Sequence, residues 1–368
     1  MNKKFRNLSK DIIEPYARSN DENQQLSKEL INTLSKKGLL GAIVDKKYGG
    51  LGYSMVEVGQ LVEEVGRVCS ATRNLFTVHG MLQLAIQRFG SKQQKEYWLP
   101  KTVTDECIGA FALTEPEIGS DAKNIKMDAK KIEGGYLLNG HKKWITMGNI
   151  AHLFLVFAKV EGKATAFLVE RESKGLEIEP IKNMLGVRGS EVALLTFKDC
   201  FVSEDNILGK IGNGFNLVAL SALNYGRYTV ACGSLGLAEG CLDEALKYAS
   251  TREQFGDKLK SNQLIQKKLT EMIVETKAAR CLCYEAGKLY DDLDPEAVMS
   301  IWMAKYKATK VLTSCASETV QIFGANGLCN DYNIERFYRD ARVNEIIEGT
   351  TEMHEILIAN YVLNRLKF

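Results

Sequence analysis

The chain has 368 residues, with 48 basic against 46 acidic side chains and a formal net charge of +2. Phosphate binding needs a surplus of Lys and Arg, so this balance argues against nucleic acid as a partner. The longest uncharged stretch, residues 211–226, contains Asn and Gly and is shorter than the roughly 20 apolar residues of a membrane helix, so no membrane span is predicted.

The cysteines and histidines form no metal or disulfide pattern. The nine cysteines are odd in number and include no Cys-x-x-Cys pair, and the four histidines have no HExxH or HxxxH spacing. We therefore expect reduced, mostly buried thiols in a cytoplasmic protein, and no metal site.

Residues 1–106 are predicted to be helical. Ser54 and Glu57 form a capping box ahead of an apolar run, and Gly38 is a helix stop. It follows four apolar residues that share one helical face, namely Leu26, Leu30, Ile31 and Leu34.

Residues 107–213 change to the period of β-strands. The alternating segment 125–132, the turn 133–135 and the returning segment 136–146 predict a β-hairpin. Further strands are expected at 153–157, 165–169 and 192–197. Because short turns rather than helices join them, we expect an antiparallel β unit.

Residues 214–368 return to the helical period. Gly226, Gly233, Gly236 and Gly240 lie within this pattern, where each costs about 1 kcal/mol relative to Ala. We interpret them as sites of close helix–helix approach, where a side chain would not fit. The chain order is thus helices, a β unit, then helices.

Two common nucleotide-binding motifs are absent from the sequence. Neither 50–52 nor 212–214 continues into G-x-G-x-x-G, and there is no P-loop. A nicotinamide-binding Rossmann fold and a nucleoside triphosphatase are therefore both disfavoured.

Five short segments have no obvious packing role: FALTEPEIGSD at 111–121, WIT at 144–146, REQFG at 252–256, QIFGANG at 321–327 and IEGTTEM at 347–353. Together and in this order, they resemble the acyl-CoA dehydrogenase family of flavoproteins across nearly the whole chain. The resemblance implies a mostly α fold with a central β domain: an N-terminal helical domain, a middle antiparallel β-barrel-like domain and a C-terminal four-helix bundle. It also implies a homodimer or homotetramer with bound FAD and an electron-accepting partner.

The resemblance assigns cofactor contacts to three groups of residues. The flavin would lie among Phe111, Leu113, Thr114, Gly119, Ser120, Trp144, Ile145 and Thr146. A further group would contact the pyrophosphate and adenosine half of the FAD that belongs to a neighbouring subunit. This group is Arg252, Phe255, Gln263, Gln321, Gly324 and Ala325. Thr350 and Glu352 would touch the FAD again. An arginine suits a pyrophosphate, glycines permit close backbone approach, and an aromatic wall suits a flat isoalloxazine.

Glu348 is the residue that the resemblance makes the catalytic base. In the family, this carboxylate removes the α-proton of an acyl thioester while the β-hydrogen leaves as hydride to flavin N5. Some members carry the base at the position of Gly226 instead, and glycine removes that option here. The resemblance places Ser120, Asn224, Arg227 and Gly349 beside the thioester and its pantetheine arm.

The segments 68–74, 225–227 and 338–349 look similar to a branch of the family that acts on acyl carrier proteins in polyketide and nonribosomal peptide biosynthesis. The chain also begins late for the family, and has His354-Glu355 and Asn360 where cations are common. We therefore expect a small polar acyl unit, of the hydroxymalonyl or aminomalonyl extender type, on a carrier protein. One alternative is a short-chain acyl-CoA dehydrogenase of catabolism. Another is a flavin oxygenase or non-catalytic binding protein, against which Glu348 argues.

Overall fold

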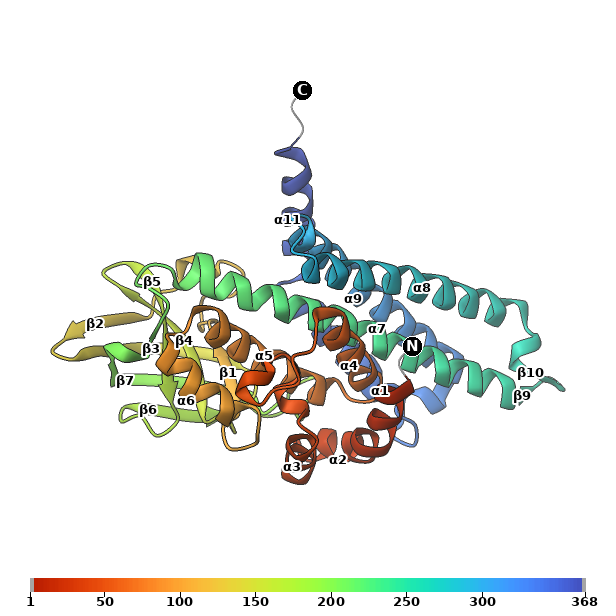
Figure 1. Cartoon of the computed structure of the whole chain (residues 1–368). Helices are drawn as coiled ribbons and strands as arrows, with labels where there is room; N and C mark the ends of the chain where they lie inside the picture. Colours follow the sequence, from red (N-terminus) through yellow and green to blue (C-terminus); the bar gives the residue numbers. More distant parts are fainter. Residues whose placement is uncertain (1–2, 366–368) are drawn as a thin grey trace.

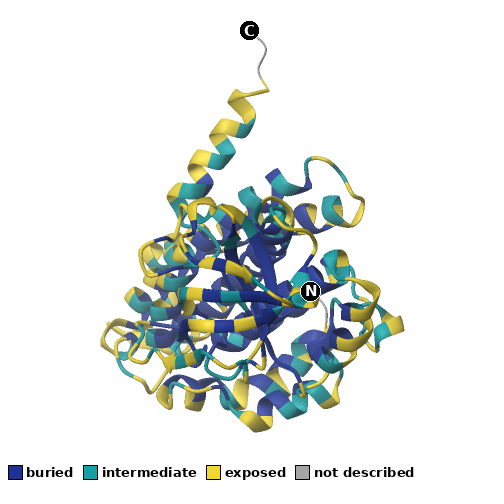
Figure 2. Ribbon diagram, turned by 90° about the vertical axis from the view of Figure 1, so that its left-hand side faces the viewer, coloured by how far each residue is buried: buried dark blue, intermediate teal, exposed yellow. Residues whose placement is uncertain are grey.

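The structure is a computed structural model that describes residues 3–365. Helices and a β-sheet segregate along the chain as expected, with the sheet at one end of an elongated body and the longest helices running toward the other (Figure 1). Buried residues collect inside both parts, and exposed residues line the outer rim (Figure 2). Within residues 3–365, no helix is long and apolar enough to cross a bilayer.

The N-terminal region consists of helices, as predicted. The capping box at Ser54 and Glu57 is formed in full, and Gly38 adopts the left-handed conformation after the third helix. The helices are α1 (Lys3–Leu8), α2 (Glu14–Glu22), α3 (Lys28–Lys36), α4 (Met55–Val68), α5 (Ser70–Phe89) and α6 (Lys92–Thr102).

The middle region is one eight-stranded sheet in which the predicted hairpin is β2 paired with β3. The strands are β1 (Gly109–Ala112), β2 (Asp128–Ile132), β3 (Gly135–Ile145), β4 (Leu153–Val160), β5 (Lys163–Glu170), β6 (Leu176–Pro180), β7 (Ala193–Ser203) and β8 (Ile207–Leu208).

The sheet is mainly antiparallel but differs from the expectation in two pairings. Strand β4 runs parallel to β1 over four residues and parallel to β2 at one pair of residues, Asp128 and Lys159. The β2–β3 hairpin lies between β1 and β4 in the sequence. The chain therefore makes a crossover before β4 pairs with β1, and the two strands run in the same direction. Local turn signals predict hairpins, whereas this pairing is between segments about 40 residues apart in the sequence.

The C-terminal region is built around three long helices packed on one another, of which the first two also pack on α4. They are α7 (Leu220–Thr251), α8 (Gln263–Asp291) and α9 (Ala297–Phe323). A short arm of β9 (Glu253–Gln254) and β10 (Asp257–Lys258) joins the first two, and α10 (Ile334–Ile346) and α11 (Thr351–Leu363) end the chain.

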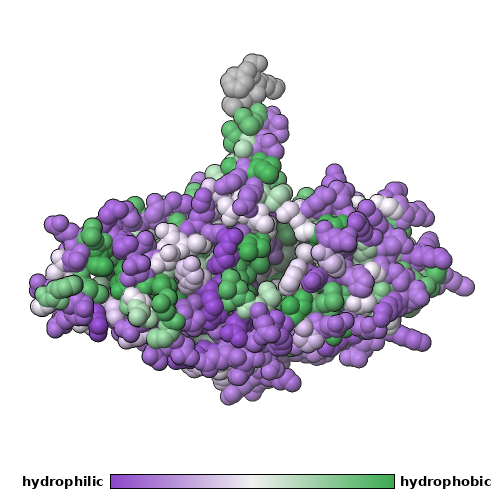
Figure 3. All heavy atoms as spheres, turned by 180° about the vertical axis from the view of Figure 1, so that it is seen from behind, coloured by the Kyte–Doolittle hydropathy of each residue, from purple (hydrophilic) through white to green (hydrophobic). Residues whose placement is uncertain are grey.

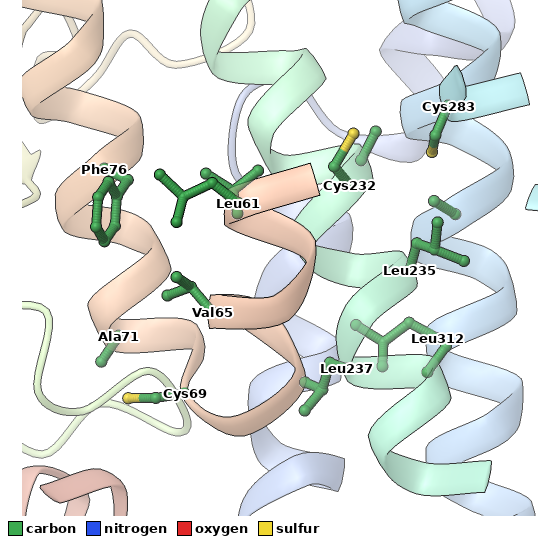
Figure 4. Packing of buried hydrophobic residues seen from close by; sticks show 14 of the residues in the cluster. Leu61, Val65, Cys69, Ala71, Phe76, Cys232, Leu235, Leu237, Cys283 and Leu312 are labelled. Atoms are coloured by element: carbon green, nitrogen blue, oxygen red, sulfur yellow. The ribbon is translucent and has the colours of Figure 1, made fainter. Parts of the chain in front are cut away.

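The glycines of α7 do allow close helix packing. A Cβ at Gly236 would lie 1.8 Å from the carbonyl oxygen of Glu63, and one at Gly66 would lie 2.4 Å from that of Gly233. Helices α4 and α7 therefore touch through their backbones. Figure 4 shows how side chains from α4, α5, α7, α8 and α9 fill the space around this contact, among them Leu61, Phe76, Leu235, Cys283 and Leu312.

Helix α11 projects from the body, and α9 is the helix it packs against most (Figure 1). Its outer part exposes Ile356, Val362 and Leu363. Seen from behind, hydrophobic atoms on this helix and on the body below it are bordered by hydrophilic surface (Figure 3).

Candidate active site

The turn between α10 and α11 has an unusual backbone. Glu348 has φ +55° and Gly349 has φ +96°, so two consecutive residues are left-handed. Glycine tolerates this conformation, but a glutamate in it is uncommon, and such outliers concentrate at functional sites. Thr350 then caps α11, because its Oγ1 accepts a hydrogen bond of 3.4 Å from the backbone N–H of Met353.

This turn directs the Glu348 carboxyl group against α7 at Gly226. A Cβ on Gly226 would lie 2.3 Å from Glu348 Oε2, so glycine makes room for the carboxyl group. Oε2 is buried, and within residues 3–365 it has no hydrogen-bond partner. Burial raises the pKa of Glu348 from 4.5 to about 7, although three nearby cations oppose the rise: Arg227, Lys305 and Arg73. Glu348 is therefore tuned to take up a proton near neutral pH.

Two of these cations hold the backbone of the turn. Arg227 Nε donates a hydrogen bond of 3.2 Å to the carbonyl oxygen of Glu348, and its Nη1 donates one of 3.5 Å to Asn224 Oδ1. Lys305 Nζ donates to the carbonyl oxygens of Glu345 at 3.1 Å and Gly349 at 2.7 Å. Lys305 is fully buried, and this burial lowers the pKa of its ammonium group to about 7.

A second group of predicted residues meets at the ends of β1 and β3. The backbone N–H of Lys143 donates to the carbonyl oxygen of Thr114 at 2.9 Å, which joins the two segments. Trp144 is 48% exposed with φ +63°, and the space where Gly119 would carry a Cβ is open. The group consists of Phe111, Leu113, Thr114, Gly119, Ser120, Trp144, Ile145 and Thr146. Its exposed members, Gly119, Ser120 and Trp144, form an open ledge, whereas the side chains of Leu113 and Ile145 are buried in the core beneath it.

A buried ion pair supports this ledge from behind. Lys142 is fully buried, and its Nζ donates to Glu115 Oε1 at 2.8 Å and to the carbonyl oxygen of Leu113 at 2.9 Å. The same carboxylate accepts from the backbone N–H groups of Lys126 and Met127. The carboxylate thus ties together the start and the end of the segment 113–127, which joins β1 to β2.

Lys142→Met is expected to lower the free energy of unfolding by about 3–5 kcal/mol, because it leaves the Glu115 carboxylate buried without its cation. The double variant Lys142→Met/Glu115→Gln should recover part of this loss. Urea unfolding measures both. The matched control is Lys198→Met in the same sheet, where the pair with Glu177 is exposed and should contribute about 0–1 kcal/mol. Equal losses in the buried and exposed variants would contradict the prediction.

The third predicted group lies elsewhere on the chain. Arg252, Phe255 and Gln263 are exposed on and beside the β9–β10 arm, and the Phe255 side chain is fully accessible. The end of α9 lies next to this region, because Tyr248 stacks on Phe323 at 4.0 Å and accepts a hydrogen bond from Asn326. This segment carries Gln321, Gly324 and Ala325. Figure 1 shows the arm at the opposite end of the molecule from the sheet, so one chain does not bring this group to the ledge.

The remaining predicted residues lie at the start of α11, and three residues that were not predicted support either the turn or the ledge. Thr350 and Glu352 open α11, while His354, which replaces a common cation, is buried with its Nδ1 2.9 Å from the carbonyl oxygen of Thr350. Arg73, Lys142 and Lys305 were not predicted to have a role. The sequence gives no clear signal for them, because each has polar neighbours, as in Thr72-Arg73-Asn74 and His141-Lys142-Lys143.

Comparison with known proteins gives consistent matches along the whole chain. The models of the N-terminal, middle and C-terminal domains of acyl-CoA dehydrogenase match residues 1–106, 110–200 and 212–363. An acyl-CoA dehydrogenase of Bacillus subtilis (strain 168) is 37% identical, covering 99% of this chain and 97% of that protein. The structure of butyryl-CoA dehydrogenase from Megasphaera elsdenii matches with a TM-score of 0.94 and 32% identity, over 98% of this chain and 97% of the other.

A structure of a prolyl acyl carrier protein oxidase also matches, with a TM-score of 0.91 at 27% identity over 98% of this chain and 99% of that one. It is less similar in sequence than the acyl-CoA dehydrogenases. The sequence, the domain order and the fold therefore agree that this chain belongs to the acyl-CoA dehydrogenase family, whose cofactor is FAD.

Proposed function

We propose that this protein is an FAD-dependent dehydrogenase of short acyl thioesters in which Glu348 is the base. The observation that carries the proposal is the Glu348 carboxyl group itself, which is held in a strained turn with a pKa raised to about 7 and an Oε2 without a partner in the described chain. A carboxylate with these properties is suited to removing a weakly acidic α-proton.

The ledge at the sheet edge fits the flavin of FAD. Trp144 offers a half-exposed aromatic face, and the space around Gly119 lets a ligand approach the backbone. We propose that Phe111, Leu113, Thr114, Ser120, Ile145 and Thr146 complete these contacts, and that Thr350 and Glu352 add to them. When bound, the flavin supplies the hydride acceptor.

The chain's own residues handle the proton and the thioester. Glu348 takes the α-proton, and the electrons of that C–H bond form the new double bond as the β-hydrogen leaves with its electron pair. Arg227 and Gly349 border the thioester with Ser120 and Asn224, and Arg227 adds positive charge beside the developing enolate. Arg227 also donates a hydrogen bond to the carbonyl oxygen of Glu348. The residue that contacts the substrate thus also helps to position the base.

The group on the arm supports a homo-oligomer. Arg252, Phe255, Gln263, Gln321, Gly324 and Ala325 lie far from the ledge of their own chain (Figure 1). We propose that they hold the pyrophosphate and adenosine of the FAD bound to a second copy. The fully exposed Phe255 and the open backbone at Gly324 are consistent with contacts made outside the chain. A separate electron-accepting partner would then reoxidise the flavin.

Coenzyme A is the tether that the comparisons favour. Relatives at 34–37% identity are named as acyl-CoA dehydrogenases, short-chain and short/branched-chain ones among them, and one at 36% is named as an acryloyl-CoA reductase (NADH). A carrier-protein tether is the second candidate, and the overall match to the prolyl acyl carrier protein oxidase supports it. Under that candidate the enzyme would belong to extender-unit biosynthesis rather than to acyl catabolism.

The test is anaerobic reduction of the purified yellow protein by acyl thioesters, followed as bleaching of the flavin absorbance. We expect bleaching by short acyl-CoA substrates and a higher kcat/KM than with the same acyl group on a carrier protein. Preference for the carrier-protein form would transfer the assignment to the second candidate. A protein that cannot be loaded with FAD, or a flavin that no acyl thioester reduces, would refute the proposed function.

A further inference from the structure

A pocket of about 280 Å³ lies between helix α2, the loop that joins β6 to β7, and the segment that leads into α10. This volume is slightly below the roughly 300–1,000 Å³ of sites for drug-sized ligands, so the pocket suits a small ion or metabolite. Its lining is mostly charged, with three carboxylates and four arginines, namely Arg18, Arg188, Arg336 and Arg339. No residue proposed above to hold FAD or the thioester lines this pocket.

The three carboxylates of this pocket are already paired with two of its arginines. Arg339 donates to both oxygens of Asp21, at 3.0 and 2.6 Å, and its Nε donates to Glu335 Oε2 at 2.7 Å. Arg18 Nε donates to Glu22 Oε1 at 3.0 Å. The other two arginines of the lining are therefore left without a carboxylate of their own.

Arg188 and Arg336 are the two arginines without a counter-ion. The Arg188 side chain has no hydrogen-bond or ion-pair partner within residues 3–365, and its Nε is buried. Arg336 is 4% exposed, and its Nη1 donates to the carbonyl oxygen of Val68 at 2.9 Å. Asp340 is close to Arg336 but forms no ion pair within the described chain, and its Oδ1 accepts from the backbone N–H of Val187. Because a guanidinium taken out of water without a counter-ion is costly, an anion that reaches both arginines would be bound.

We propose that this pocket binds a phosphate group, held by Arg188 and Arg336 with the half-exposed Arg18 at its rim. A phosphate group carries about 1.5–2 negative charges near pH 7, which matches two arginines that lack a counter-ion. Its three or more acceptor oxygens can meet two guanidinium groups at once, whereas the two oxygens of a carboxylate are satisfied by one. The source of the group is either free inorganic phosphate or a small phosphate ester.

A phosphate in this pocket would join three segments that already meet at α10. Arg339 of α10 pairs with Asp21 of α2, and it also donates to the carbonyl oxygen of Leu185 in the β6–β7 loop at 3.3 Å. Helix α10 ends at Ile346, two residues before Glu348. The bound group would therefore stabilise the packing of the helix that leads into the catalytic turn, and it would not touch the reacting atoms.

The experiment is calorimetric titration of the FAD-loaded protein with inorganic phosphate, in a buffer without phosphate or sulfate. We expect saturable binding at one site per chain. Arg188→Met should raise the Kd for phosphate by about 10–100-fold, the effect of losing charged hydrogen bonds. Without phosphate, the same variant should melt at the same temperature or higher, because it removes a cation that has no partner. Arg188→Lys, which keeps the charge but not the planar fork, should bind with intermediate affinity.

The control is Arg342→Met, which removes an exposed arginine of the same helix that pairs with Glu345, and it should leave the Kd for phosphate unchanged. Titration with glycerol 3-phosphate separates the two sources, since tighter binding than inorganic phosphate identifies an ester and weaker binding identifies the free ion. The absence of saturable phosphate binding, an equal Kd in wild type and Arg188→Met, or tighter binding of succinate than of phosphate would each overturn the site. The proposed function does not depend on the outcome, because the pocket is separate from the residues that handle the thioester.

Discussion

Glu348→Gln is expected to lower the rate of flavin reduction by about 10²–10⁴-fold, the usual contribution of a positioned general base. The amide is nearly the same size as the carboxylate, so the turn, its left-handed backbone and its contact with Gly226 should persist. The variant should therefore purify as a yellow protein with its FAD bound. Stopped-flow reduction by a short acyl-CoA measures the loss.

Glu345→Gln is the matched control for this variant. Glu345 lies three residues earlier, and its carboxylate pairs with Arg342 rather than facing α7. Its loss should change the reduction rate by less than about threefold, within the range of effects of a peripheral ion pair. Comparable losses of rate in both variants would mean that flavin reduction depends on the total negative charge near the turn, and that the base is another residue.

The pH dependence of Glu348 follows from the same burial. Its pKa of about 7 means that the base is protonated below this pH, so kcat should fall as the pH drops through 7. The raised pKa also means that the folded state binds more protons than the unfolded state between pH 4.5 and 7. The stability that Glu348 contributes in its protonated form is therefore lost as the pH rises through 7. Glu348→Gln should raise the melting temperature at pH 8 and change it little at pH 4.

Sequence patterns predicted the local structure well because the signals there are local. The capping box at Ser54, the turn after β2 and the glycines of α7 each depend on residues close in the chain or on a steric property of one residue. Glu348 and the ledge residues were assigned from the resemblance to a known family, because the motifs that contain them are contiguous strings. The parallel pairing of β1 with β4 has no such signal.

The buried polar residues that support the site could not be predicted either, because their contacts join residues that are far apart in the sequence. Arg73 meets Asn344 across 271 positions, and Lys305 reaches Gly349 across 44. Each of these contacts depends on how α5, α9 and the turn pack, and a lone charged residue in a helix is usually solvent-exposed.

Lys305→Met is expected to change both the maximal rate and the pH profile of kcat. The pH profile distinguishes a local effect on the turn from a general loss of stability. Without the ammonium group, the carbonyl oxygens of Glu345 and Gly349 lose their donor, at about 1–3 kcal/mol for each group left buried and unpaired. The cation also lowers the pKa of Glu348, so its removal should move that pKa above 7. The acidic limb of the kcat profile should then shift toward alkaline pH, together with a drop in the maximal rate of about tenfold or more.

Lys310→Met is the control for Lys305→Met, because Lys310 lies on the same helix but is exposed and contacts Tyr306. It should leave both the rate and the pH profile unchanged. A purely structural role for Lys305 would lower the melting temperature and the yield of active enzyme without moving the pH profile of the molecules that remain folded. The shift of the acidic limb is therefore the decisive readout, since it reports the field of the ammonium group at the Glu348 carboxyl group and nothing that depends on the amount of folded protein.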